Sequence, residues 1–443
     1  MKRRTFIKNT SAVSAGILLS NKIAAKRISP NEKLQIGVIG CNGMGWSNTN
    51  SLLKIPEVDL VGICDVDSSV VERRLNDYAE LRKNIPVIHA DYRELLNDKN
   101  IDAVVIGTPD HWHCKQMVDA VQAGKHVYVE KPLANSIKEC NVMLDAAKKS
   151  GKIVQVGQWQ RSGPHYREAI DLVRSGKLGN IRLVKVWAYQ GWMKPVNRVP
   201  DEPAPAGVDY RAWLGPAPNR PFNKNRFHFN FRWFWDYAGG LMTDWGVHEI
   251  DIALYAMQAK APVSVMASGG KLAYPDDASE TPDTLQAVFQ YKDFNMLWEH
   301  ATGIDIGPYG RREGIAFIGN NGTLVVDRGG FEVYVEKVSK GYSEWGDPKM
   351  ELIEKYERPD DVNYLDLHTH NFVEAIKAND VSKLNTPIDS GSVAAINAQM
   401  GNIAFKTGKK IYWDAVNGKF IKNKKANRLL AAKYHNGWKM PSV

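Results

Sequence analysis

Short apolar runs alternate with helix-like segments over the first third of the chain. The runs are rich in β-branched residues, the pattern of strands buried on both faces of a parallel sheet. They are Leu34–Ile39, Leu60–Cys64, Ala103–Gly107, His126–Glu130 and Ile153–Gly157. Asp119–Ala123 and Ile137–Ser150 are two of the helix-like segments between them. This alternation predicts a doubly wound parallel sheet with helices on both faces, spanning residues 33–158.

The pattern changes after residue 158, where strand-like runs predominate. These runs are Ile181–Tyr189, Val263–Ala273, Thr284–Tyr291, Asn295–Ala301, Gly314–Ile318, Leu324–Asp327 and Phe331–Val335. Asn321-Gly322 between two of them is a hairpin signal. Leu365–Ala378 and Ser392–Phe405 have the pattern of amphipathic helices. We predict an α/β fold whose second, α+β domain covers residues 159–415 and holds a large open antiparallel sheet. Residues 416–443 are expected to be a tail that packs on the body.

Glycines follow the first apolar run at once, in the sequence LQIGVIGCNGMG of Leu34–Gly45. A strand that ends in glycines and then opens a helix is the phosphate-binding turn of a Rossmann dinucleotide fold. Glycine lets the backbone approach a pyrophosphate, which the free N–H groups of the helix N-terminus bind. Gly40 and Gly45 fill the first and third glycine positions, but Asn42 stands at the second. Asn tolerates a left-handed backbone, and Gly43 is the alternative for that role.

Asp65 ends the second apolar run, twenty residues after Gly45. An acid at this distance binds the ribose 2′-hydroxyl of NAD. No Arg or Lys follows before Arg73, so the 2′-phosphate of NADP has no evident partner. We therefore predict NAD as the cofactor.

Polar residues end four of the predicted strands, and the carboxyl ends of parallel strands meet at one edge of a sheet. These residues are Asp65 and Val66, Thr108-Pro109-Asp110, Glu130-Lys131-Pro132 and Gln158. Lys131 follows an apolar strand and precedes the rigid Pro132. A cation there can stabilise negative charge that develops on a reacting oxygen. On spacing alone, a solvated surface charge fits Lys131 equally well.

The segment Gly239–Asp251, GGLMTDWGVHEID, carries the second candidate for chemistry. Asp244 and His248 are four residues apart and share one face of a helix. A carboxylate beside an imidazole orients the ring and adjusts its basicity, and His suits a general base near neutral pH. The alternative is an ordinary helical pair without a catalytic role.

A stretch rich in Pro, Arg and aromatic residues lies between Gly191 and Asp236, with little periodicity. Loops of this length are uncommon unless they have a function. Its aromatic side chains suit stacking on a sugar, and a packed lid without ligand contact is the alternative. The candidate substrate-binding residues come from this stretch and from positions outside it. They are Arg161, Tyr189, His228, Trp233, Trp235 and Tyr237.

The net charge of +9 is concentrated at the N-terminus, where residues 1–27 carry seven positive charges and no acid. The remaining charge of 9 − 7 = +2 does not favour nucleic-acid binding. Arg3-Arg4-Thr5-Phe6 and the apolar stretch Ala12–Leu19 are similar to a twin-arginine (Tat) export signal, with cleavage expected near Ala25. The apolar stretch is too short to span a bilayer, so the mature chain is expected to be periplasmic. The four cysteines match neither a metal site nor a disulfide framework and are expected to be buried.

Taken together, the glycine turn, Asp65, Thr-Pro-Asp-His-Trp-His at residues 108–113 and Glu-Lys-Pro at residues 130–132 resemble the Gfo/Idh/MocA family of sugar oxidoreductases. The resemblance covers residues 33–415. It implies that Lys131 lies beside the nicotinamide and the reacting hydroxyl, and that Asp244 and His248 form the family's Asp-x-x-x-His motif. The family gives no metal, so His111 and His113 are not expected to bind one. Open sheets in the family imply a homo-oligomer.

The predicted site follows from these observations. Lys131, Asp244 and His248 are the catalytic candidates. The cofactor candidates are Gly40, Asn42, Gly43, Met44, Gly45, Asp65, Val66, Thr108, Pro109, Asp110, His113, Glu130, Lys131 and Gln158.

The expected activity is oxidation of a sugar or glycoside hydroxyl, at C3, by hydride transfer to tightly bound NAD. A redox-neutral glycosidase, which oxidises, eliminates and reduces again, is the close alternative. A non-catalytic sugar-binding protein is the alternative from another class.

Overall fold

The computed structural model describes residues 33–82 and 84–443, and the predicted export segment with its cleavage site lies outside them. The first domain contains a six-stranded sheet in which every pairing is parallel, in the order β3-β2-β1-β4-β5-β6. Its strands are β1 (Leu34–Ile39), β2 (Val58–Cys64), β3 (Val87–Ile88), β4 (Ala103–Ile106), β5 (His126–Val129) and β6 (Val154–Val156). The expected Rossmann sheet is therefore confirmed.

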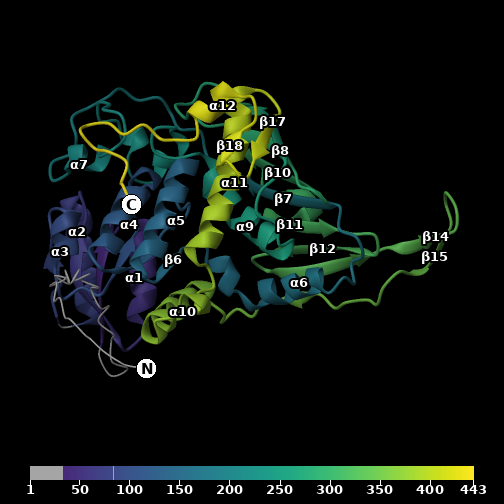
Figure 1. Cartoon of the computed structure of the whole chain (residues 1–443), viewed down its shortest axis with the longest axis horizontal. Helices are drawn as coiled ribbons and strands as arrows, with labels where there is room; N and C mark the ends of the chain where they lie inside the picture. Colours follow the sequence, from purple (N-terminus) through teal and green to yellow (C-terminus); the bar gives the residue numbers. More distant parts are fainter. Residues whose placement is uncertain (1–32, 83) are drawn as a thin grey trace, which may run out of the picture.

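Helices cover both faces of this sheet (Figure 1). They are α1 (Gly43–Leu53), α2 (Ser68–Leu81), α3 (Tyr92–Asn97), α4 (Asp110–Gln122) and α5 (Ile137–Ser150). Local sequence sets the ends of α5: Ser136 accepts the Glu139 N–H and Gly151 closes the helix at φ +64°. Two separate apolar clusters fill the spaces between the sheet and its helices.

The second domain contains a ten-stranded mixed sheet, in the order β16-β13-β12-β11-β7-β10-β9-β8-β17-β18. Its strands are β7 (Leu183–Gln190), β8 (Ser264–Gly270), β9 (Thr284–Gln290), β10 (Asn295–Thr302), β11 (Glu313–Ile318), β12 (Gly322–Asp327), β13 (Gly330–Val335), β16 (Tyr356–Glu357), β17 (Ile411–Asp414) and β18 (Lys419–Phe420). The predicted hairpin at Asn321-Gly322 joins β11 to β12.

One pairing in this sheet differs from the wholly antiparallel sheet that we expected, because β7 and β10 are parallel. The chain leaves the sheet after β7 for a long excursion and returns through β8 and β9, so no hairpin fixes the direction of β7 against β10. Short helices mark the excursion: α7 (Tyr210–Leu214), α8 (Leu241–Asp244) and α9 (Gly246–Ala256), with the 3₁₀ turns η2 (Lys224–Arg226) and η3 (His228–Trp233).

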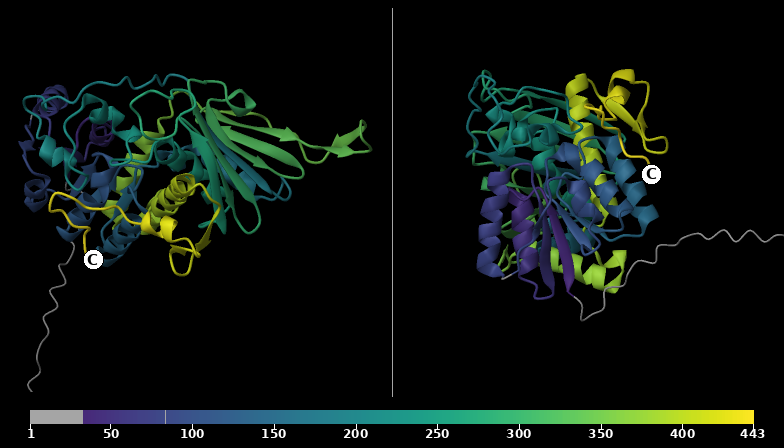
Figure 2. Two further views of the ribbon diagram at one scale, coloured as in Figure 1. Left: turned by 90° about the horizontal axis from the view of Figure 1, so that it is seen from above. Right: turned by 90° about the vertical axis from the view of Figure 1, so that its left-hand side faces the viewer.

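Helices cover one face of the large sheet. α6 (Pro164–Arg174), α9 and α11 (Ile388–Thr407) pack there, over the largest apolar cluster. In Figure 2 the green sheet forms a layer with the yellow α11 beside it. α10 (Tyr364–Ala378) and α11 also pack against the first domain, so both predicted amphipathic helices join the two domains.

One feature at the edge of the large sheet was not anticipated. β14 (Lys337–Ser339) and β15 (Trp345–Pro348) form a hairpin that projects from the end of the large sheet (Figure 1). After α12 (Lys424–Arg428) the chain runs back over the first domain. The remaining 3₁₀ turns are η1 (Trp159–Ser162), η4 (Pro308–Gly310) and η5 (Val381–Lys383).

Three features of the described residues concern disulfide bonds, membrane-spanning helices and metal sites. All four cysteines are buried and unpaired. Among residues 33–82 and 84–443, no helix has both the length and the apolarity to cross a bilayer, and no group of three His, Cys, Asp or Glu is arranged to bind a metal ion.

Candidate active site

The glycine turn joins β1 to α1 through contacts that only glycine permits. Gly40 has φ +76°, and a Cβ there would lie 2.7 Å from the Thr108 backbone nitrogen. A Cβ on Gly45 would lie 1.9 Å from the Gly40 carbonyl oxygen. Asn42 is extended, at φ −89°, and the left-handed residue beside it is Gly43 at φ +45°. Of the two alternatives for this role, the structure therefore selects Gly43.

A cavity of about 990 Å³ opens at the carboxyl edge of the parallel sheet. Most of the predicted cofactor residues line it: Gly40, Asn42, Gly43, Met44, Asp65, Val66, Thr108, Pro109, Asp110, Glu130 and Lys131. Residues that are 91 positions apart in the chain thus meet at one edge, as the strand-end pattern predicts.

Three predicted cofactor residues do not line the cavity. Gly45 lies beneath the turn against Gly40. His113 is buried, with its ring nitrogens 2.8 Å from the carbonyl oxygens of Pro132 and Thr108. The Gln158 side-chain amide donates to the Val247 carbonyl oxygen at 3.1 Å. These residues lie behind the cavity wall and support its backbone, and their contact with the cofactor stays a prediction.

Asp65 lies at the end of β2 beside the glycine turn. Its carboxylate accepts the backbone N–H groups of Cys41 at 2.8 Å and of Asp67 at 3.1 Å. Burial raises the pKa of Asp65, and these hydrogen bonds oppose that shift. Helix α2 also brings Arg74 back to the turn, where its Nε donates to the Cys41 carbonyl oxygen at 3.1 Å.

Lys131, Asp244 and Arg232 form a partly buried cluster at the cavity. The Lys131 Nζ lies 2.6 Å from the Asp244 Oδ1 and 3.1 Å from the Asp244 carbonyl oxygen. The Arg232 Nε lies 3.2 Å from the same carboxylate oxygen. Burial opposes ionisation of Asp244, but Lys131 and Arg232 hold the pKa of this carboxyl well below its usual range. The Lys131 ammonium is thereby fixed at the wall of the cavity.

This cluster corrects the predicted pairing of Asp244 with His248. In the described chain the Asp244 carboxylate bonds Lys131 and Arg232, and no hydrogen bond joins it to His248. Trp245 interrupts the helix between α8 and α9, so Asp244 and His248 do not lie on one regular helix. Asp244 acts on His248 only through its charge.

His248 lies in the first turn of α9, behind the Lys131–Asp244 pair, and does not line the cavity itself. Its ring packs edge-on against Trp159 at 5.7 Å and Trp245 at 6.2 Å between centroids. Its Nδ1 is buried without a hydrogen-bond partner in the described chain. Burial, together with the charges of Lys131 and Arg328, lowers the pKa of His248 well below its usual value. The ring is therefore neutral near pH 7 and able to accept a proton.

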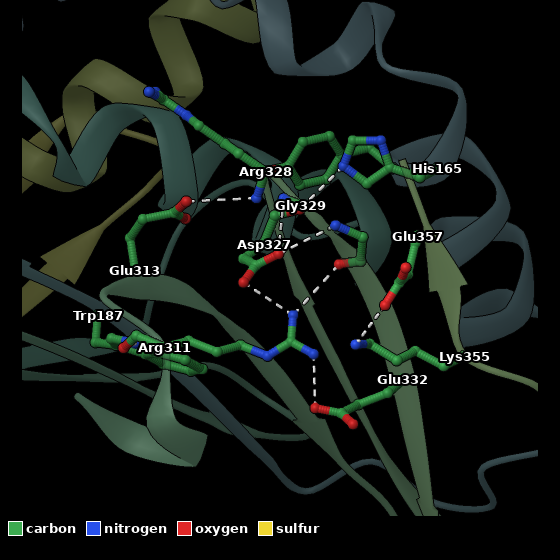
Figure 3. A network of polar contacts seen from close by, with 12 residues as sticks. His165, Trp187, Arg311, Glu313, Asp327, Arg328, Gly329, Glu332, Lys355 and Glu357 are labelled. Carbon is green, nitrogen blue, oxygen red and sulfur yellow. Dashed lines mark hydrogen bonds and ion pairs between the residues drawn. The ribbon is translucent and has the colours of Figure 1, made fainter. Parts of the chain in front are cut away.

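Arg328, whose charge acts on His248, belongs to the network of polar contacts drawn in Figure 3. Arg311 pairs with Asp327 at 2.9 Å and with Glu332 at 2.6 Å, which ties β11, β12 and β13 together. The next residue, Arg328, stacks its guanidinium 4.5 Å from the Trp159 ring and 4.4 Å from the Trp245 ring. The Arg328 guanidinium also donates to the Gln160 side-chain oxygen at 3.1 Å, and its charge adds to burial in lowering the pKa of His248.

Two further carboxyl groups, Asp110 and Glu130, line the cavity beside Lys131. Burial raises the pKa of Asp110 to about 7 against the opposing charges of Arg232 and Lys131. Glu130 accepts from the Asn48 side-chain amide at 2.7 Å and from the Lys131 N–H at 3.2 Å. Asp110 therefore titrates close to physiological pH.

The predicted substrate residues are placed in several different environments. His228 lines the cavity, but its Nε2 pairs with Asp67 at 3.0 Å, on the glycine-turn side. Trp233 and Tyr237 are buried in an aromatic cluster of the excursion. Trp235 lies under the Lys406 ammonium at 3.6 Å, and the Tyr189 hydroxyl donates to Glu299 at 3.4 Å. Of the six residues, only His228 lines the cavity.

Arg161 is the sixth of these residues and forms a buried ion pair. Its Nε and Nη2 each lie 2.7 Å from the Asp251 carboxylate, and its Nη1 donates to the Ser390 hydroxyl at 3.0 Å. The bidentate pair joins η1 to α9 and α11. Arg161 does not line the cavity, and its predicted role in substrate binding stays a prediction.

Replacing Arg161 with Met is expected to destabilise the fold. The change leaves the Asp251 charge buried without its partner, at a cost of about 3 kcal/mol, which lowers the melting temperature by roughly 3–4 °C. Differential scanning calorimetry measures this shift. Arg167→Met is the matched control, since among the described residues its guanidinium bonds the Asn385 side chain and the Arg161 carbonyl oxygen and pairs with no carboxylate. An unchanged melting temperature with a raised KM would return Arg161 to the substrate site.

Sequence reasoning missed four residues that shape the site. Arg232 and Trp112 line the cavity, Arg328 lies beside His248, and Trp438 reaches the cavity from the C-terminal end. The Thr108–His113 segment already contained Trp112, but no spacing rule connects Arg232, Arg328 or Trp438 to the glycine turn. Only tertiary packing brings them together.

Comparisons with known proteins agree with this architecture. Residues 34–158 match the profile described as "Oxidoreductase family, NAD-binding Rossmann fold" (GFO_IDH_MocA), and residues 162–440 match "Oxidoreductase family, C-terminal alpha/beta domain". The "Uncharacterized oxidoreductase YrbE" of Bacillus subtilis is 26% identical over 296 residues, 67% of this chain and 74% of that protein.

An "Alpha-N-acetylgalactosaminidase" of Shewanella oneidensis is 29% identical over 201 residues, 40% of this chain and 44% of the enzyme. The match thus spans less than half the length of that relative. Among solved structures, levoglucosan dehydrogenase with NADH and levoglucosan aligns with a TM-score of 0.62 at 19% identity, covering 86% of this chain and 99% of that one. The aldose-aldose oxidoreductase of Caulobacter crescentus aligns with a TM-score of 0.62 at 18% identity, covering 86% and 100%. These structures share the fold.

Proposed function

Because this chain belongs to the Gfo/Idh/MocA family of oxidoreductases, whose N-terminal domain binds NAD, we propose that it oxidises a sugar or glycoside hydroxyl, at C3, with tightly held NAD. The observation that carries the proposal is the Lys131 ammonium, fixed by Asp244 at the cavity wall, beside the neutral His248.

The residues of the cavity fit this cofactor. At Gly45 a Cβ would lie 1.9 Å from the Gly40 carbonyl oxygen, so the turn is as compact as a pyrophosphate cradle requires. The first turn of α1 offers free N–H groups to the phosphates, and Asp65 offers a carboxylate to the ribose hydroxyls. Lys131 and Asp110 also line this cavity.

The chain's own residues would divide the reaction between them. Bound NAD supplies the acceptor for the hydride that leaves the sugar carbon. His248 takes the hydroxyl proton, because its ring is neutral and its nitrogen lone pair is free to accept one. Lys131 donates a hydrogen bond to the sugar oxygen as its negative charge grows and a carbonyl forms. Asp244 and Arg232 hold the ammonium in place.

A redox-neutral glycosidase is the second candidate, and the similarity to the alpha-N-acetylgalactosaminidase favours it. A ketone at C3 acidifies the proton at C2, and its removal expels the group at C1 without a pair of catalytic carboxylates. Returning the hydride to C3 after water adds completes the cycle. A non-catalytic sugar-binding protein is the third candidate. The partly buried Lys131–Asp244–Arg232 cluster argues against it, because binding a sugar does not require an ammonium held by a carboxylate.

The location and assembly of the protein are further parts of the proposal. Residues 1–27 would direct export of the folded chain through the Tat pathway to the periplasm, with NAD loaded beforehand in the cytoplasm. The mature protein would assemble as a homo-oligomer. Cell fractionation and light scattering measure these two properties.

One assay separates the two enzymatic readings. The purified protein, without added NAD, is incubated with aryl glycosides and monitored for the free phenol and for absorbance at the nicotinamide band. An oxidoreductase produces reduced cofactor and no phenol, whereas a glycosidase releases phenol with no net reduced cofactor. A protein that does neither with any of a broad set of sugars and glycosides contradicts the proposed activity.

A further inference from the structure

The last residues of the chain, 430–443, lie across the first domain and are called the C-terminal strap here. Figure 1 shows this yellow segment running from α12 to the chain end near α4. The strap is bonded to the first domain at its start, since the Lys138 N–H donates to the Leu430 carbonyl oxygen at 2.8 Å. The Tyr434 hydroxyl donates to the buried Glu139 carboxylate at 2.8 Å. The strap is thus part of the folded body.

Its middle is bonded to the loop after α7. The His435 N–H donates to the Pro216 carbonyl oxygen at 3.0 Å. The Asn436 side-chain amide donates to the carbonyl oxygens of Gly215 and Ala217, both at 2.9 Å. Because these anchors come from separate elements, lifting the strap away requires several hydrogen bonds to break together.

A left-handed turn then directs one aromatic ring into the cavity wall. Asn436 has φ +54° and Gly437 has φ +81°, and Trp438 follows them. The Trp438 ring packs edge-on against Trp112 at 5.0 Å between centroids, and the Arg93 guanidinium lies 5.4 Å from it. All three side chains line the 990 Å³ cavity. The chain terminus therefore builds part of the nucleotide site.

The topology indicates which half of the dinucleotide this wall faces. Arg93 follows β3, the edge strand beyond β2, whose end carries Asp65. Lys131 follows β5, three positions further along the sheet. Trp438 is therefore on the adenosine side of the cavity, away from the reacting centre, where a flat aromatic wall suits a heteroaromatic base.

We propose that the C-terminal strap retains the bound nucleotide, with Trp438 as the contact that slows its departure. An aromatic wall and a strap held by several bonds raise the barrier to dissociation more than they change the encounter rate. The inference rests on NAD binding and on the tightly held cofactor of the proposed function, but not on the identity of the sugar.

The test measures the release of NAD from the full-length protein after it has been stripped and reloaded. Protein and free nucleotide are separated at intervals, and the NAD that remains bound is quantified by chromatography. Trp438→Ala is expected to release NAD about tenfold faster, in line with the loss of one aromatic stacking contact. Trp438→Phe is expected to stay within about threefold of the parent protein, because an aromatic wall remains.

Two variants keep the result interpretable. Trp345→Ala is the matched control, since this tryptophan is 61% exposed on the projecting hairpin and should not change the release rate. Tyr434→Phe removes one anchor without altering the cavity wall and should speed release a few-fold; it decides the matter if Trp438→Ala does not fold. A folded Trp438→Ala protein that holds NAD as long as the parent overturns the inference. Faster NAD release from the Trp438→Ala protein, together with a parent protein that oxidises no sugar, supports the strap and refutes the proposed activity instead.

Discussion

Replacing Lys131 with Met is expected to lower kcat/KM for sugar oxidation about 10³-fold. The ammonium is the cation that the structure fixes at the cavity, 2.6 Å from Asp244, and removing such a donor from a developing oxyanion costs about 3–4 kcal/mol of barrier. The substitution preserves the length of the side chain. Asp244 keeps its second cation, Arg232 at 3.2 Å, so the fold should survive.

The measurement is steady-state kinetics combined with NAD binding by calorimetry. NAD affinity is expected to change little, because the glycine turn and Asp65 are untouched. Lys115→Met is the matched control, since it removes an ammonium that pairs with Asp119 one helical turn away. That control should retain activity within about twofold. Full turnover by the Lys131→Met protein would eliminate the proposed enzymatic mechanism.

Replacing His248 with Gln is expected to lower kcat/KM by about 10²- to 10⁴-fold, the usual contribution of a general base. Glutamine keeps the approximate size of the side chain and a hydrogen-bonding end, but it cannot take a proton near neutral pH. His370→Gln serves as the control, because His370 is exposed on α10 and pairs only with Glu374 at 3.5 Å. The expected loss is specific to the ring beside Lys131.

The pH dependence adds a second readout for His248. Burial, Lys131 and Arg328 depress its pKa, so the neutral, proton-accepting form persists as the pH falls below 6.5. The acid limb of kcat/KM that belongs to His248 should therefore lie well below pH 6.5 and disappear in His248→Gln. A separate change in the pH profile of kcat/KM near pH 7 is expected from Asp110, because burial raises the pKa of its carboxyl to about 7. A His248→Gln protein with parental activity and an unchanged pH profile would contradict the assignment.

The parts of the fold that local sequence encodes could be predicted from the chain alone. The glycine turn, Asp65 and the strand-end residues Thr108 and Glu130 follow from periodicity and from the rule that parallel strands end at one edge. They line the cavity as expected. The Asn321-Gly322 hairpin follows from turn chemistry in the same way.

Where the structure differs from these expectations, the physical cause is the same. Charged partners distant in sequence form the contacts that were expected from nearby residues or from substrate. Asp244 was expected to orient His248 four residues away, but Lys131, 113 residues earlier, takes its carboxylate. Arg161 was expected to bind substrate, but its guanidinium forms an ion pair with Asp251. Helical spacing predicts which residues share a face of the helix. It does not predict which charged side chain from another element bonds them. For the same reason, no local pattern predicted that Trp438 would form part of the cavity wall.

The account depends on Lys131 and His248 acting on the same oxygen, and a crystal structure with NADH and a bound sugar tests this most directly. The predicted result places the Lys131 Nζ and a ring nitrogen of His248 each within about 3 Å of one sugar hydroxyl, the reach that proton transfer and hydrogen bonding require. A sugar bound with its hydroxyls far from either group, or with His248 still covered by Trp159 and Trp245 and out of reach, would contradict the account.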